Sequence, residues 1–200
     1  MPSRLDDLLT RITQLEREVE TELGQARDEW RYKIEAGRVR FEHDVRRAHD
    51  RLKQSIPTFI RESRPLNLLS APVIYSLIVP IALLDLWISA YQAACFPLYG
   101  IARVRRSTYI VIDRHHLGYL NAIEKLNCVY CGYVNGVFAY VREIAGRTEQ
   151  YWCPIRHGKR VPTPHVHYRE FVDYGDAKGY HRELPMLRAR LKGRRSADDA

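Results

Sequence analysis

Three cysteines and one histidine in the second half of the chain have the types and spacing of metal ligands. Cys128 and Cys131 form a C-x-x-C pair in NCVYCGYVNG, and Cys153 and His157 form C-x-x-x-H in WCPIRH. Three sulfurs and one imidazole are a common ligand set for zinc and fill its four tetrahedral positions. The pattern therefore predicts a structural zinc site, with small core cysteines as the alternative.

The helix expected between the two pairs decides whether the four ligands meet in one chain. A straight helix over residues 134–152 would hold the pairs close to 30 Å apart, at about 1.5 Å per residue. The site closes within one chain only if this helix ends early, and Gly146 is suited to a C-terminal cap. Otherwise the pairs meet between two chains or form no common site. The fourth cysteine, Cys95, lies in an apolar segment, which favours zinc over a four-thiolate iron site.

Other polar residues could transfer protons or bind a ligand, although each of these types is more often a surface or structural residue. Asp113, His115 and His116 are the catalytic candidates, as an acid, a base and a ligand. The weaker candidates are His165, His167, Glu124, Glu143 and Glu149. The chain has no phosphate-binding glycine loop, nucleophile elbow or metalloprotease helix motif, so an enzyme is not the favoured interpretation.

A run of apolar residues from Leu68 to Ile101 indicates attachment to a membrane. The stretch from Ala71 to Ala94 is long enough to span a bilayer core, which takes about 20 apolar residues in a helix. It is interrupted by Pro80 and Asp85. A buried core helix is the alternative, but a chain of 200 residues offers little protein to bury it.

Basic residues flank the apolar run on both sides, as short cytoplasmic loops do. They are Lys53, Arg61 and Arg64 before it, and Arg103, Arg105 and Arg106 after it. A single span cannot place both flanks in the cytoplasm, whereas a re-entrant hairpin bent at Pro80 can. A hairpin would also bring Asp85 nearer the interface, where a charge costs less. Both topologies remain open, and the hairpin is preferred.

Residues 3–56 are expected to form one long amphipathic helix. Its apolar residues recur about every 3.6 positions from Leu5 to Ile34 and, after one lapse, from Phe41 to Ile56. A narrow apolar stripe on so long a helix needs a partner. Self-association through residues 5–56 as a coiled coil is the preferred prediction, and folding back on the C-terminal domain is the alternative.

The net charge of +8 lies entirely after the apolar run, in a region with 18 Lys and Arg residues and only 10 Asp and Glu residues. Such an excess suits anionic membrane lipid, and it would also suit nucleic acid. The tyrosines of this region follow apolar patterns rather than alternating with arginine, so nucleic acid is the less favoured partner. No signal peptide is evident at the N-terminus, and thiols without an export signal indicate a reducing compartment.

These segments predict a mainly α-helical fold. The expected parts are a long helix or coiled coil over 1–56, a junction over 57–67, a membrane segment over 68–101, a zinc-stapled helical domain over 102–191, and a disordered tail over 192–200. Within the domain, a last amphipathic helix is expected from Ala177 to Leu191, after an irregular stretch over 158–179.

The NCVYC and EQYWCPIRH motifs, with DRHHLGYLNAIEKL before them, resemble a bacterial family of uncharacterised membrane-associated proteins over roughly residues 65–180. The resemblance implies a bacterial membrane protein and no particular activity. The basic flanks, the thiols and the absence of an export signal place the expected location at the cytoplasmic face of the inner membrane. The favoured hypothesis is a membrane-attached, zinc-stabilised scaffold or adaptor. The alternatives are a membrane-surface enzyme acting on a lipid or lipid-linked phosphate, and a zinc protein that binds nucleic acid.

Overall fold

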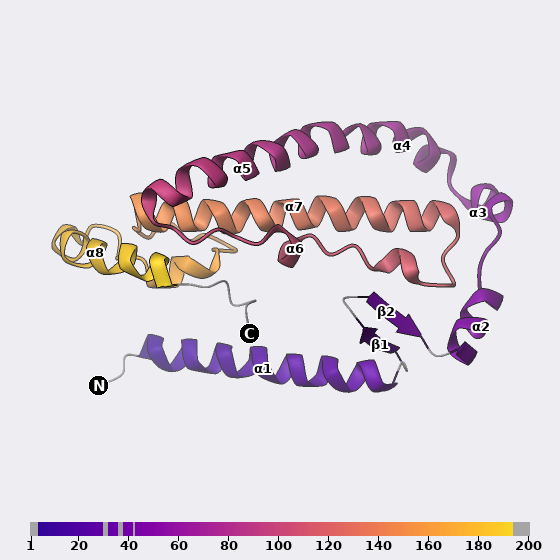
Figure 1. Cartoon of the computed structure of the whole chain (residues 1–200), viewed down its shortest axis with the longest axis horizontal. Helices are drawn as coiled ribbons and strands as arrows, with labels where there is room; N and C mark the ends of the chain where they lie inside the picture. Colours follow the sequence, from indigo (N-terminus) through magenta and orange to yellow (C-terminus); the bar gives the residue numbers. More distant parts are fainter. Residues whose placement is uncertain (1–3, 30–31, 36–37, 42, 194–200) are drawn as a thin grey trace. The chain divides into compact units, whose positions relative to one another are not determined.

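The computed structural model describes residues 4–29, 32–35, 38–41 and 43–193, and it is mainly helical, as the sequence predicts (Figure 1). The α-helices are α1 (Arg4–Glu29), α2 (His43–Arg51), α3 (Ile56–Glu62), α4 (Pro65–Ser76), α5 (Ile78–Tyr99), α6 (Arg106–Tyr109), α7 (Ala122–Trp152) and α8 (Ala177–Gly193). The other elements are strands β1 (Tyr32–Glu35) and β2 (Arg38–Phe41) and 3-10 helices η1 (Arg114–His116) and η2 (Val166–Glu170). The chain forms two compact units, residues 1–62 with 113–125 and residues 63–112 with 126–200.

The N-terminal helix is shorter than the one predicted over residues 3–56. α1 ends at Glu29, and β1 and β2 follow as an antiparallel hairpin in which Tyr32 pairs with Phe41 and Ile34 with Val39. These aromatic and β-branched residues favour strands over helix interiors. They occupy the stretch where the helical apolar pattern lapses. The prediction of one continuous helix to residue 56 is therefore wrong. The predicted stripe of apolar residues is continuous only within α1.

The apolar run forms α4 and α5, which follow one another through the single residue Leu77 (Figure 1). Pro80 lies in the first turn of α5, where a missing backbone N–H is tolerated. It leaves the Ser76 carbonyl without its helical partner, and this is where α4 ends. The chain does not reverse at Pro80. The predicted hairpin bend is thus absent, and Pro65–Tyr99 forms one helical stretch of 35 residues that is long and apolar enough to cross a membrane.

The chain reverses after α5. Gly100 adopts the left-handed conformation, with φ +68°, and Ile101 N donates to Phe96 O across the turn. Residues 101–112 then run back beside α5 without regular structure apart from the single turn of α6. Val104 N donates to Gln92 Oε1 over 3.0 Å, and Arg106 further along the segment bonds Asp85, which is two turns earlier in the helix. The segment thus runs antiparallel to α5.

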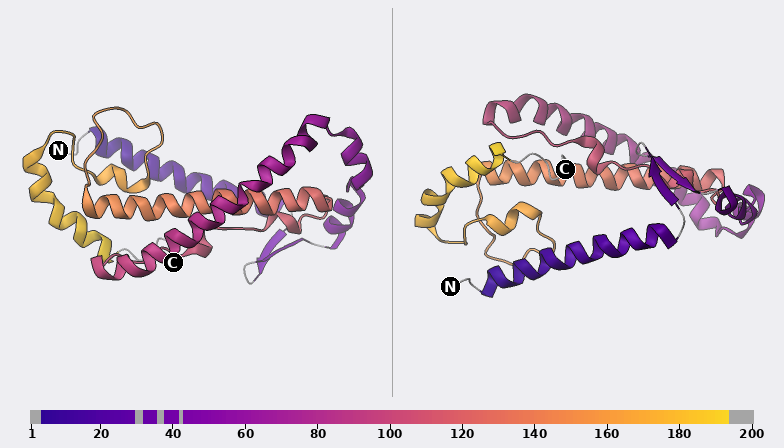
Figure 2. Two further views of the ribbon diagram at one scale, coloured as in Figure 1. Left: turned by 90° about the horizontal axis from the view of Figure 1, so that it is seen from above. Right: turned by 60° about the horizontal axis from the view of Figure 1, so that its bottom comes forward.

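α7 lies against α4 and α5, crosses them obliquely and runs in the same general direction (Figures 1 and 2). Tyr75 at the end of α4 donates a hydrogen bond to Asn127 near the start of α7. Further along both helices, the hydroxyls of Tyr91 and Thr148 lie 3.0 Å apart. The buried core joins α5, the returning segment, α7 and α8 through Phe96, Ile101, Val104, Tyr140, Ile144 and Leu191.

The C-terminal part follows the sequence expectation closely. Residues 153–176 are irregular apart from η2, and one isolated bridge joins Ile155 to Val172. The predicted last helix is confirmed as α8, which begins at Ala177 and buries Leu187 and Leu191. The predicted tail starts at residue 192, but α8 continues to Gly193. Residues 194–200 lie outside the described part of the chain.

Candidate functional site

The four predicted metal ligands lie in two separate places. Cys128 and Cys131 stand within α7, and Cys153 follows its last residue, with His157 beyond. α7 continues through Gly146, so the early end that a single-chain site requires does not occur. At about 1.5 Å per residue, the helix holds Cys131 and Cys153 roughly 33 Å apart. Among the described residues, no three His, Cys, Asp or Glu side chains form a group that could hold a metal ion.

Zinc binding therefore stays a prediction, in the form of a site that joins two chains. Metal analysis of the purified full chain is expected to find zinc that disappears in a Cys128→Ser and Cys153→Ser double variant. Serine in place of Cys95, the cysteine of α5 that belongs to neither pair, is the matched control and should keep the metal. A stably folded protein that is purified without zinc and binds none when zinc is added contradicts the prediction.

Gly146 has a different role from the predicted helix cap. A Cβ atom at this position would stand 2.8 Å from His165 Nδ1 and 3.0 Å from His167 Cδ2. The glycine thus lets two imidazole rings lie directly against α7. The alternation of His165 and His167 in the sequence does bring them to one surface, although they lie at the start of η2 rather than in a strand.

Glu143, Arg147 and His167 form a buried polar cluster between α7 and η2. Arg147 Nε donates to Glu143 Oε1 over 2.7 Å, and His167 Nε2 lies 3.0 Å from the same oxygen. Arg147 also donates to the carbonyl of Ala102 at 2.8 Å. The three residues are only 9%, 3% and 2% exposed, respectively. Burial alone would raise the pKa of Glu143, but the bonds from His167 and Arg147 outweigh it and lower the pKa to about 2.

A second carboxylate–imidazole pair lies beside this cluster. His165 Nε2 is 2.8 Å from Glu149 Oε2. The other ring nitrogen of His165 is buried and has no hydrogen-bond partner within the described part of the chain. Two of the weaker sequence candidates thus pair with each other, as do Glu143 and His167.

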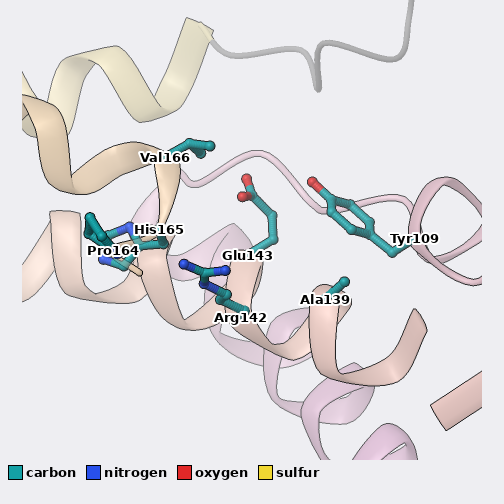
Figure 3. A pocket seen from close by; sticks show the side chains of 7 residues that line it. All are labelled: Tyr109, Ala139, Arg142, Glu143, Pro164, His165 and Val166. Atoms are coloured by element: carbon teal, nitrogen blue, oxygen red, sulfur yellow. The ribbon is translucent and has the colours of Figure 1, made fainter. Parts of the chain in front are cut away.

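The buried cluster borders a cavity of about 210 Å³ (Figure 3). Its polar lining comes from Tyr109, Arg142, Glu143 and His165. Figure 3 shows the Tyr109 hydroxyl and the Glu143 carboxylate on facing sides, with Arg142 beside the ring of His165. The two bonds that join Glu143 to Arg147 and His167 both fall on Oε1. An ionised carboxylate, a guanidinium and a phenol can together hold a small polar molecule.

A second polar network lies on the inner face of α5. Arg106 donates to both carboxylate oxygens of Asp85, at 2.6 Å in the shortest contact, and Tyr133 donates to Oδ2 at 3.0 Å. Two turns later Gln92 bonds Val104 through both ends of its amide and also contacts Tyr140. The polar side chains of this apolar helix are thus satisfied by protein partners.

The catalytic candidates Asp113, His115 and His116 stand close together in and beside η1. The two imidazole rings are 3.9 Å apart, and the backbone N–H of His116 donates to the Asp113 carbonyl. His115 Nδ1 is buried without a hydrogen-bond partner among the described residues. The cavity beside Glu143 is lined by other residues. A catalytic role for these three residues remains a prediction.

No family model matches the chain, and the comparisons with curated proteins and with solved structures also give no match. The resemblance to a family of membrane-associated bacterial proteins therefore remains a prediction.

The depressed pKa of Glu143 predicts a loss of stability in acid. The ordinary pKa is near 4.5 and the folded value near 2, so the ionised form favours the folded state above pH 4.5. This contribution, on the order of 3 kcal/mol, should disappear as the pH falls from 4.5 to 2. Unfolding free energies measured by denaturant titration across this range should fall more steeply for the natural chain than for Glu143→Gln.

Asp173→Asn is the control for this titration, because it removes one carboxylate from a surface pair with Arg156. Its stability profile should follow that of the natural chain. Equal slopes for the natural chain and for Glu143→Gln would mean that Glu143 is not held in its ionised form by His167 and Arg147.

Proposed function

We propose that this protein is a membrane-attached scaffold, held to the bilayer by α4 and α5 and available to a second copy of the chain through α1. One observation carries the proposal, which is the division of α5 into two faces. Its polar residues Asp85, Ser89 and Gln92 all face protein partners. The opposite face is apolar and exposed along its length.

This outer face is defined by large apolar side chains of α4 and α5 that are 61–81% exposed. They are Leu66, Leu69, Val73, Val79, Leu83, Leu86, Trp87 and Leu98. So large a continuous apolar surface is rare on a protein surrounded by water and is typical of an interaction surface for membrane or protein. Hydrocarbon is the environment that suits a face of this length and composition.

α1 supplies the second part of the proposal. Its apolar side chains Leu8, Ile12, Leu15, Val19 and Leu23 are spaced by three or four residues and are 39–59% exposed. Spacings of this kind place them in one stripe on the helix. The rest of the surface of α1 is mostly charged, which is the composition of helices that pair through a narrow seam. A second α1 is therefore the proposed partner.

The oligomeric state of the full chain in detergent tests the scaffold proposal. The natural chain is expected to sediment as a dimer or larger assembly, whereas Leu15→Glu with Val19→Glu is expected to sediment as a monomer, because carboxylates then stand in the seam. Gln14→Glu with Thr21→Glu adds the same two charges to the opposite side of α1 and should leave the assembly intact. A natural chain that is monomeric at micromolar concentration contradicts self-association.

A further inference from the structure

We propose that α4 and α5 lie in the plane of one leaflet, with the outer face among the acyl chains, and do not cross the bilayer. The inference rests on the proposed membrane attachment and specifies its geometry. It also names the occupant of the outer face, which is the acyl-chain region just beneath anionic headgroups.

The segment that accompanies α5 is the first argument. Residues 101–112 run beside the helix, and Arg106 reaches Asp85 about two turns into it. An α5 that crossed the bilayer would carry this irregular segment into the hydrocarbon, where non-helical backbone is tolerated only when protein or water surrounds it. Arg103 and Arg105 are exposed on the same segment. Arg105 stands between Val104 and Arg106, which contact Gln92 and Asp85, so a crossing α5 would carry it near the bilayer centre, where an arginine costs a few kcal/mol or more.

Arg103 shows how the segment can instead border the bilayer. Pro97 has no N–H to give to the Ala93 carbonyl, and Arg103 Nη2 donates to this carbonyl over 2.9 Å. The guanidinium thus lies at the edge of the outer face, near its C-terminal end. A cation at the border of an apolar face is the arrangement of interfacial helices, which keep charge at the headgroups and apolar side chains below.

α7 gives the second argument, because it accompanies α5 in the same direction. The hydroxyl of Tyr91 in α5 contacts that of Thr148, which follows Arg147 of the buried ion pair with Glu143 in the sequence of α7. A crossing α5 would therefore take these ionised groups and the exposed Arg142 toward the membrane as well. An α5 in the plane of the leaflet leaves them all on the aqueous side.

The length of the helical stretch formed by α4 and α5 also favours a helix in the plane of the leaflet. A helical stretch of 35 residues from Pro65 to Tyr99 is about 52 Å long, against a hydrocarbon thickness of about 30 Å. α5 alone would fit the bilayer, but Leu66, Leu69 and Val73 of α4 would then remain exposed to water. In the plane of the leaflet the whole outer face is covered, and no mismatch arises.

Basic residues at both ends of the stretch fit this geometry. Arg61 and Arg64 precede α4, Arg103 and Arg105 follow α5, and all four are exposed. A helix in the plane of one leaflet keeps both ends on one side, where the arginines reach anionic headgroups. Each basic residue near such a surface contributes about 1 kcal/mol to binding.

Nitroxide labels at three positions of the outer face test the inference. Leu69→Cys, Leu83→Cys and Leu98→Cys are made singly in a full chain whose four native cysteines are serine, and each is labelled and bound to vesicles of phosphatidylcholine with anionic phosphatidylglycerol. Collision with oxygen and with a water-soluble nickel complex gives the depth of each label. The three depths should be equal and within about 10 Å of the headgroup boundary. A label at Tyr174→Cys, which is exposed on the irregular C-terminal part, should remain in water.

A deep label at position 83 between two shallow labels at 69 and 98 would show a crossing helix and overturn the inference, while membrane attachment stands. A chain that does not float with the vesicles would instead overturn the proposed attachment itself. If the cysteine-free chain does not fold, brominated lipids applied to the natural chain and to Trp87→Phe isolate the quenching of Trp87. Bromines near the headgroup end of the acyl chains should then quench it most, and strongest quenching by bromines near the bilayer centre would contradict the in-plane helix.

Discussion

Replacing Arg147 with methionine is expected to destabilise the unit formed by residues 63–112 and 126–200 by about 3–5 kcal/mol, the range found when one partner of a buried ion pair is removed. Methionine keeps much of the volume of arginine but has no guanidinium. Glu143 thus loses its bond from Arg147, and the Ala102 carbonyl loses the hydrogen bond that Arg147 donates. Glu143 is only 9% exposed, so loss of the guanidinium leaves a largely desolvated carboxylate short of its cationic partner. Denaturant unfolding of the two proteins at neutral pH measures the difference.

Two further variants show whether the loss comes from the unpaired charge. Arg182→Met removes an arginine that is 72% exposed in its pair with Glu183, and its stability should not change measurably. Glu143→Gln combined with Arg147→Met should be less destabilised than the sum of the two single changes, because no ionised group is then left alone. Strict additivity, or a loss below about 1 kcal/mol for Arg147→Met, would show that the pair is solvated in solution.

Adding one methyl group at Gly136 is expected to cost about 1–3 kcal/mol, the usual range for overpacking, and to loosen the contact between α7 and the returning segment. The new Cβ would stand 2.7 Å from Ile110 Cα and 2.8 Å from the Tyr109 carbonyl oxygen. Both are backbone atoms, so no side chain can rotate away to relieve the contact. The Gly136→Ala chain should unfold at a lower temperature than the natural chain.

Gly24→Ala in α1 is the matched control, because a Cβ there meets nothing within 4 Å. Alanine is the better helix former, so this change should raise the stability of α1 by up to about 1 kcal/mol. If Gly136→Ala were tolerated as well as Gly24→Ala, the backbone of Tyr109 and Ile110 would not lie against α7 in solution.

Particular residues show how much of this molecule could be predicted from the sequence. The apolar run and the spacing of Tyr180, Leu184, Leu187 and Leu191 predict helices, and α5 and α8 confirm them. Helical periodicity is a strong local signal when an apolar stripe is buried or long. The hairpin of β1 and β2 is hard to predict from the sequence, because it interrupts the helical spacing of apolar residues over only a few positions.

The candidate site is less predictable, because tertiary contacts decide it. Gly146 looks the same in the sequence whether it caps a helix or admits two imidazole rings, and here it does the second. Glu143 and Arg147 stand four residues apart, as do many solvated pairs on helices. This pair is buried, and it is contacted by His167 of η2, 24 residues from Glu143, and by the Ala102 carbonyl of the returning segment. A glycine within an otherwise good helical stretch, followed by two alternating histidines, is the signal that the sequence offers.

Recovery of the full chain with floating vesicles tests membrane attachment most directly. The natural chain should rise with vesicles of mixed neutral and anionic lipid, whereas Leu69→Glu, Leu83→Glu and Leu98→Glu combined should remain at the bottom of the gradient. Three glutamates in place of the exposed residues Thr163, Tyr174 and Met186 are the matched control, and this variant should float. A natural chain that stays unbound, or an outer-face variant that floats as well as the control, would contradict attachment through α4 and α5.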